Sequence, residues 1–139
     1  MTHCNFIKER SGGFTRLVFV RNYDLPMNQV MQHIGIAAVP DALREVSSSI
    51  AAECIASLLW KDMAYGHEFM SLEKARDYAN SYIGQFDFEQ VRFYTNGSWH
   101  EYHVKSGCAY TPLTEATFSA VILAVHPQFA AGLIIEDED

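Results

Sequence analysis

The sequence predicts an α+β fold, a two-layer sandwich in which a mostly antiparallel sheet packs against two helices. Between residues 41 and 84, apolar residues recur every three or four positions, which is the period of amphipathic helices. Residues 14–21 are rich in β-branched and aromatic side chains, and after residue 90 the period switches to two, as in strands. Short connections between the later strands favour antiparallel neighbours.

The first element is expected to be a strand from Phe14 to Arg21. This strand must join the same sheet as the later ones, because only then are Leu17, Phe19 and Val20 buried. Residues 27–39 carry Gly35 among small apolar residues, and we expect a loop there that includes a short helical turn.

The two helices are marked by their caps. The main core helix begins at Asp41 or, because Ser favours caps over helix interiors, at Ser47–Ser49, and it ends at Gly66. The second helix follows Ser71, an N-cap, and ends at Gly84, where a left-handed C-terminal cap is expected. Each helix carries an apolar stripe that is expected to pack on the sheet.

A β-hairpin is expected around Asn96-Gly97. Residues 91–95 and 98–104 alternate in polarity on either side of this dipeptide, and both of its residues tolerate the positive φ of a type I′ turn. Strands at 118–125 and 131–135 then complete a four-stranded meander. The sheet is therefore expected to consist of one N-terminal strand and this C-terminal meander.

One face of the predicted hairpin is amphipathic. The two-residue turn pairs Tyr94 with Trp99 and Arg92 with Glu101, and His103 lies on the same face. An aromatic pair beside a charge pair suits a surface that is sometimes wet and sometimes covered by a partner. These five residues are the predicted contact face. The alternative is that the aromatic pair only strengthens the hairpin or packs beneath the carboxy-terminal segment.

The chain ends in four acidic residues. We expect one domain, residues 1–139, that closes with this short acidic tail at 136–139, where four negative charges stand in a chain of net charge −7. Such concentrated acidity favours a basic protein partner over direct nucleic-acid binding, because the basic residues are scattered and form no patch for phosphates. The alternative is that the tail only keeps the protein soluble. The predicted binding residues of the tail are Glu136, Asp137, Glu138 and Asp139.

Composition argues against several other classes. The three cysteines, Cys4, Cys54 and Cys108, suit neither a disulfide framework nor a zinc ribbon, and they favour a reduced, cytoplasmic protein. The amino terminus has no apolar stretch long enough for a signal peptide or a membrane span. Gly12-Gly13 precedes a strand instead of leading into a helix, which is the wrong order for a phosphate loop.

No specific catalytic or metal motif stands out, so neither a cofactor nor a metal ion is expected. His67-Glu68 lacks the second histidine of a zinc-protease helix, and His100 and His103 would point to opposite faces of a strand. A nucleophilic pair of Cys108 with either of these histidines has no surrounding motif for an oxyanion hole. Enzymatic activity is not favoured.

The leading hypothesis is a non-enzymatic, acidic protein-binding module that covers a basic surface of its partner. Small bacterial immunity proteins and nuclease inhibitors work in this way, and the chain is similar to them in size, charge and predicted architecture. A second hypothesis is a small-ligand protein or enzyme with a pocket between the sheet and the main helix, lined by Trp60, Tyr65, Tyr82, His100 and Tyr102. A third is a structural module that forms homo-oligomers, for example a homodimer, through a sheet edge or the aromatic face.

Overall fold

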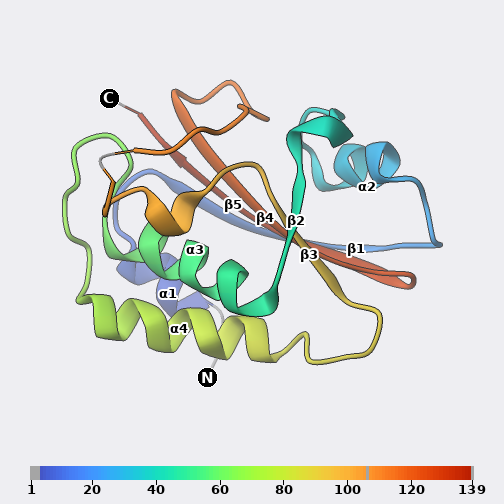
Figure 1. Cartoon of the computed structure of the whole chain (residues 1–139), viewed down its shortest axis with the longest axis horizontal. Coiled ribbons are helices and arrows are strands. Elements are labelled where there is room, and N and C mark those ends of the chain that lie inside the picture. Colours follow the sequence, from blue (N-terminus) through green and yellow to red (C-terminus); the bar gives the residue numbers. More distant parts are fainter. Residues whose placement is uncertain (1–3, 106, 139) are drawn as a thin grey trace.

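The computed structural model describes residues 4–105 and 107–138, and its centre is a five-stranded antiparallel sheet (Figure 1). The strands are β1 (Phe14–Arg21), β2 (Arg44–Val46), β3 (Arg92–Thr95), β4 (Phe118–His126) and β5 (Phe129–Asp137), in the spatial order β1-β5-β4-β3-β2. The α-helices are α1 (Cys4–Glu9), α2 (Met27–Ile34), α3 (Ser48–Trp60) and α4 (Leu72–Gly84), and the 3₁₀ helices are η1 (Pro40–Ala42) and η2 (Trp99–Glu101). The predicted α+β class is confirmed.

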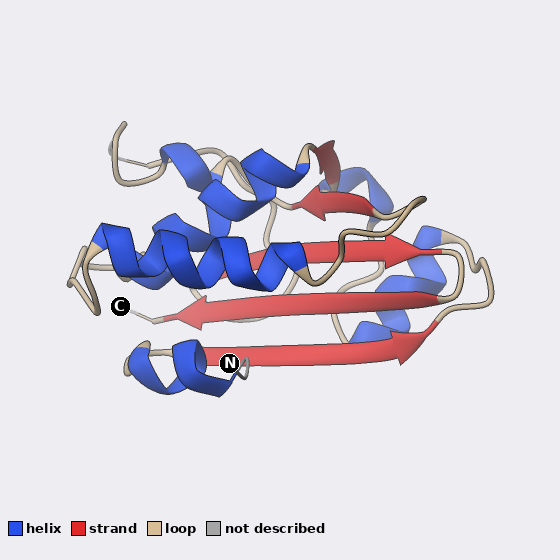
Figure 2. Cartoon of the chain, turned by 90° about the horizontal axis from the view of Figure 1, so that it is seen from below, coloured by secondary structure: helices blue, strands red, loops and turns tan. Residues whose placement is uncertain are grey.

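Helices pack on both faces of the sheet. The buried side chains form two hydrophobic cores, one on each face of the sheet. The first core lies between one face and helices α1, α3 and α4, and the second core lies between the other face and helix α2 (Figures 1 and 2). Ile122 and Leu133 belong to the first core, whereas their neighbours Val121 and Ile134 belong to the second. Burial on both faces explains the nearly continuous apolar run at 118–125, which was predicted to be a central strand.

Helix α3 begins at the serine run and not at Asp41. The Ser47 hydroxyl accepts a hydrogen bond from the Ile50 N–H (3.2 Å), which satisfies one of the free donors of the first helical turn. The helix ends at Trp60, earlier than the predicted end at Gly66. The serine cap therefore decided the start of the helix, as its residue type suggested.

Helix α4 begins after its predicted N-cap, since the Ser71 hydroxyl accepts a hydrogen bond from the Lys74 N–H (3.1 Å). Gly84 is the last helical residue, and the C-cap is Gln85, whose backbone is right-handed. The expected left-handed glycine cap at Gly84 is therefore wrong.

Residues 27–34 form helix α2, where a loop with only a short helical turn was expected. Val30, Met31 and Ile34 are buried and pack on the second face of the sheet. Gly35 closes the helix with a left-handed φ of 96°, which glycine adopts without steric cost. The apolar residues that resembled a loop are the packing surface of a short helix.

The hairpin predicted at Asn96-Gly97 does not form. Neither residue has the positive φ that a type I′ turn requires, and the expected strand at 98–104 contains the 3₁₀ helix η2 instead. Strand β3 pairs with β4 on one side and with the short edge strand β2 on the other. In the predicted four-stranded meander, the pairing of the first two strands is therefore wrong, and the pairing of the last two, β4 and β5, is correct.

Asn96 forms a buried hydrogen-bond centre. Its Nδ2 donates to the carbonyls of Thr111 (3.0 Å) and Ser119 (2.9 Å), and its Oδ1 accepts from the Trp99 indole and the Val121 N–H, both at 2.9 Å. These four bonds use the donor and acceptor capacity of the amide. Trp99 is fully buried, and burial of its large side chain outweighs the local preference of Asn-Gly for a tight turn.

Strand β1 pairs with β5, and Leu17 and Val20 pack against the two cores. Phe19, however, is 68% exposed, so the expectation that it is buried is wrong. Figure 2 shows the reason, because β1 and β5 continue past the C-terminal end of α4. No helix therefore covers the first face of the sheet at this end.

Candidate functional site

The residues of the predicted contact face are separated in the structure. Trp99 is buried, and Arg92 pairs with Glu45 of the edge strand β2 (3.3 Å) and not with Glu101. Glu101 forms an ion pair with Lys105, which holds the pKa of the Glu101 carboxyl below its usual value. The hairpin register that placed these side chains together does not exist.

The other two residues of that face have separate surroundings. Tyr94 packs against the second core, and burial raises the pKa of its hydroxyl. His103 packs edge-on against the Trp60 ring (5.8 Å between centroids), and its Nε2 lies 3.2 Å from the Lys61 carbonyl oxygen. Burial lowers the pKa of the His103 imidazole. No single surface combines the five residues.

Asp137 was predicted to belong to an acidic tail, but it is a buried residue at the end of strand β5, which also includes Glu136. The Asp137 carboxylate accepts bonds from Arg10 Nη1 (2.9 Å) and Nη2 (2.6 Å), and also from the Met63 N–H (2.9 Å). Arg10 Nε donates to the carbonyl of Leu58 (2.7 Å), one of the last carbonyls of α3, and its guanidinium stacks on Phe69 (4.7 Å). The pair ties the N-terminal segment, the end of α3 and the end of β5 together.

Glu136 and Glu138, on either side of Asp137, line an open surface hollow of about 670 Å³. We call it the acidic hollow, and its lining residues are Gly13, Phe14, Glu115, Ala116, Glu136 and Glu138. Phe14 and Glu136 are cross-strand partners, so their side chains lie on the same face of the sheet. The Glu138 carboxylate accepts a bond from the Thr117 N–H (3.2 Å), which orients it. Asp139 lies outside the described residues.

The acidic hollow combines charge with an exposed aromatic ring. Phe14 is 74% exposed, and Glu115 reaches the hollow from the segment before β4. The Arg16 Nε is 4.0 Å from Glu136 and only partly offsets the negative charge. Sequence reasoning found Glu136 and Glu138 but missed Phe14 and Glu115, because the first was assigned only to a strand and the second to a connection.

The residues predicted to line a ligand pocket also lie apart. Tyr82 is buried in the first core, whereas Tyr65 is 70% exposed. The Trp60 Nε1 donates to Glu68 (3.2 Å), and the Tyr102 hydroxyl donates to the Met63 carbonyl. These four side chains do not converge on one cavity.

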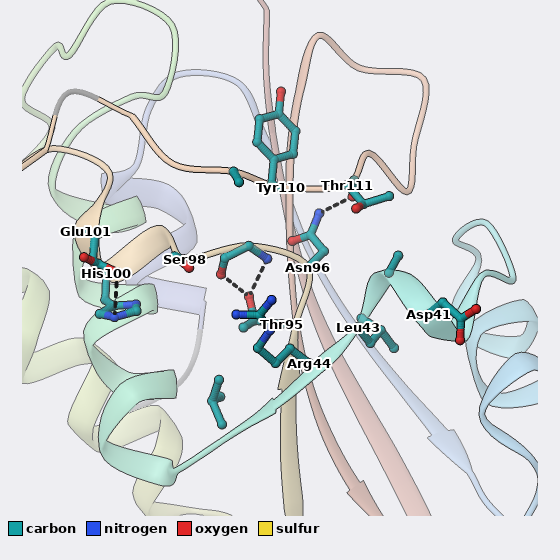
Figure 3. Close-up of a pocket in the computed structure, with 14 residues that line it drawn as sticks. Asp41, Leu43, Arg44, Thr95, Asn96, Ser98, His100, Glu101, Tyr110 and Thr111 are labelled. Atoms are coloured by element: carbon teal, nitrogen blue, oxygen red, sulfur yellow. Dashed lines mark hydrogen bonds and ion pairs between the residues drawn. The ribbon is translucent and has the colours of Figure 1, made fainter.

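His100, the fifth residue of that set, lines a second hollow of about 440 Å³ (Figure 3). Three segments form its walls: η1 together with β2, the turn from Thr95 to Glu101, and residues 109–111. Arg44 is in its wall beside its strand partner Thr95, and the described residues provide no ion-pair partner for Arg44. We call this the polar hollow.

His100 also contacts a cysteine, Cys54 of α3. The Cys54 Sγ lies 3.6 Å from His100 Nδ1, and His100 Nε2 lies 3.7 Å from Glu101 Oε1. Cys54 is fully buried in α3, and burial raises the pKa of its thiol to about 11, although the backbone N–H groups of His100 and Trp99 oppose this. A buried neutral thiol is a poor nucleophile, so the arrangement is a packing and hydrogen-bonding contact.

In residues 4–105 and 107–138, no group of three His, Cys, Asp or Glu side chains is arranged to hold a metal ion. Within the same part of the chain, no helix has the length and apolarity needed to cross a membrane. No protein-family model, curated protein or solved structure matches the chain.

Proposed function

We propose that the chain is a non-enzymatic module that binds a basic surface of a partner protein through the acidic hollow. The observation that carries this proposal is the exposed ring of Phe14 among the carboxylates of Glu115, Glu136 and Glu138. Carboxylates alone would increase solubility, whereas a ring that is 74% exposed has no such use.

The chemistry of the hollow suits Lys- and Arg-rich surfaces. The aliphatic stems of these side chains can lie on the Phe14 ring while their charged ends reach the surrounding carboxylates. An aromatic anchor inside a charged rim is a common arrangement in protein interfaces, where the anchor limits dissociation and the charges speed association. An inhibitor or immunity-type protein that covers a basic functional surface is the class that fits best, with the cytoplasm as its location.

The test uses two synthetic peptides of equal positive charge. One alternates Arg with Leu and the other alternates Arg with Ser, and each is titrated into isotopically labelled protein while backbone resonances are followed. We expect shifts at residues 13–16, 115–117 and 136–138, and tighter binding of the Arg-Leu peptide. Phe14→Ala should remove this preference for the Arg-Leu peptide.

A charge control separates the acidic hollow from general acidity. The double variant Glu136→Gln with Glu138→Gln should weaken binding about three- to tenfold, since each rim charge contributes up to about 1 kcal/mol. The double variant Glu73→Gln with Asp77→Asn removes the same charge from exposed positions of helix α4 that do not line the hollow, and it should have little effect. Equal weakening by both, or shifts spread over the whole surface, would contradict the proposal.

A second candidate function is the binding of a small polar ligand in the polar hollow. The specific observation is that Arg44 has no ion-pair partner among the described residues and stands in a hollow with His100. A ligand with one carboxylate would satisfy the guanidinium. Titration with acetate and with glycine should shift resonances of residues 41–44 and 95–101 in the parent protein and not in Arg44→Gln. Identical spectra of the parent with and without these compounds would exclude this candidate.

A further inference from the structure

Five aromatic rings gather at the end of the sheet that α4 does not cover. Phe129 is their centre, with Phe19 stacked at 5.5 Å and His126 stacked at 4.8 Å between ring centroids. Phe86 and Phe88 also contact Phe129, each at 6.1 Å. The rings come from β1, from the loop between α4 and β3, from the last residue of β4 and from the first residue of β5. We call these five residues the aromatic shelf.

The aromatic shelf faces solvent. Phe19 is 68% exposed and Phe88 is 60% exposed. Both belong to a contiguous set of rings and are not isolated surface residues. Figure 2 shows β1 and β5 running beyond α4 at this end, so no helix covers the rings. A contiguous exposed apolar patch on a small protein is characteristic of an interaction surface.

The charges around the shelf show which partner it fits. Arg21 and Phe129 are cross-strand partners, so the guanidinium lies on the same face as the shelf, on the β1 side. Asp87 and Glu89 flank Phe88 in the loop that leads to β3, which lies on the opposite side of β5 from β1. None of these three charged side chains has an ion-pair partner in the part of the chain that the structure describes.

A surface with an arginine at one border and two carboxylates at the other is self-complementary. When two copies meet face to face about a two-fold axis, Arg21 of each copy faces Asp87 and Glu89 of the other, and the rings between them pack together. A purely basic partner would be repelled by Arg21, and a purely acidic partner would be repelled by the carboxylates. A second copy satisfies both borders at once.

We propose that two copies of this chain associate through the aromatic shelf, with Arg21 of each copy paired with Asp87 and Glu89 of the other. The site is at the opposite end of β1 and β5 from the acidic hollow, so this association is independent of the proposed binding of a basic partner. The shelf contains few residues, and interfaces of this small size give weak, micromolar dimers.

The experiment is sedimentation velocity of the full chain from low micromolar to near-millimolar concentration. The parent protein should shift from monomer toward dimer as the concentration rises. Phe88→Ala should raise the dimer dissociation constant about tenfold, as is typical when a large aromatic side chain is removed from an interface. Phe14→Ala, which removes an even more exposed ring from the acidic hollow, should leave the dissociation constant unchanged.

Charge reversal tests the predicted pairing directly. Arg21→Glu and the double variant Asp87→Arg with Glu89→Arg should each be largely monomeric, because like charges then face each other. An equimolar mixture of the two should recover a dimer, since each mutant is complementary to the other. These positions are exposed, so unfolding curves that overlay the parent's will show that loss of dimer is not loss of fold.

Three outcomes would overturn the inference. The first is a parent protein that stays monomeric at every concentration. The second is a dimer that persists in Phe88→Ala but is lost in Phe14→Ala, which would place the interface at the acidic hollow. The third is a mixture of the charge-reversed variants that remains monomeric while the parent dimerises, which would exclude the Arg21 pairing.

Discussion

Breaking the buried pair of Arg10 and Asp137 should cost more stability than breaking any other ion pair described in the structure. Their side chains are 0% and 4% exposed, whereas the other pairs are substantially solvated. Loss of one partner from a buried pair costs about 3–5 kcal/mol, because the remaining charge stays buried without compensation. A surface pair contributes about 0–1 kcal/mol by comparison.

Asp137→Asn keeps the shape of the side chain and removes its charge. The Arg10 guanidinium then lacks its counter-charge, and one of the two bonds from Arg10 must be lost because an amide presents a single oxygen. We expect the free energy of unfolding to fall by about 3–5 kcal/mol in urea titrations followed by circular dichroism. Glu53→Gln, which removes a solvated partner of Arg76, is the matched control and should cost less than about 1 kcal/mol.

A double-mutant cycle with Arg10→Met completes the test. Arg10→Met also removes the bond to the Leu58 carbonyl at the end of α3, so it should cost about as much as Asp137→Asn. The two substitutions together should cost clearly less than their sum, with a coupling of about 1–3 kcal/mol. Strict additivity, or a cost for Asp137→Asn as small as that of Glu53→Gln, would refute the reasoning.

Three further predictions concern residues that hold the fold. Asn96→Ala leaves the Trp99 indole without its acceptor and should lower the free energy of unfolding in urea by about 2–4 kcal/mol. Asn80→Ala, at an exposed position, should be nearly neutral, and equal losses for the two variants would contradict the hydrogen-bond network around Asn96. Gly13 and Gly66 both have positive φ, but only a Cβ at residue 13 would clash with backbone, 2.3 Å from the Glu136 carbonyl oxygen. Gly13→Ala should therefore lower the free energy of unfolding several-fold more than Gly66→Ala. Similar losses for the two variants would show that the backbone around residue 13 moves to accommodate the Cβ. Because burial raises the pKa of Cys54 from 9.0 to about 11, the folded state retains the thiol proton longer, and the contribution of this thiol to stability should fall above pH 9 by about 1.4 kcal/mol per pH unit until its folded pKa is reached. Cys54→Ala should flatten this slope in unfolding titrations from pH 8 to about 10, and an unchanged slope would assign the effect to other groups.

Only part of the candidate site could be predicted from the sequence. Glu136 and Glu138 were predicted because they belong to a run of four consecutive acidic residues, which needs no structural information to recognise. Phe14 was not, since its exposure depends on which part of the sheet the helices cover. The aromatic shelf was missed for the same reason, because its rings come from three segments that become neighbours only in the fold.

The sequence alone determined the elements whose signals are local and strong. The serine caps at Ser47 and Ser71 start α3 and α4, because a hydroxyl must satisfy N–H groups that a helix leaves free. The β-branched and aromatic residues of β1 and the continuous apolar runs of β4 and β5 form the paired strands that these patterns predict. Together these elements were enough to establish the α+β class.

Tertiary structure decided every position where burial competed with a local preference. Asn96-Gly97 favours a turn, yet Trp99 gains more by complete burial beside an amide whose four hydrogen bonds are all satisfied. Asp137 resembles a solvated tail residue, but Arg10 lies 127 positions earlier and draws it into the interior. Local sequence cannot show such long-range partners, and for this reason it predicted the fold class of the protein but not which charges and rings remain at its surface.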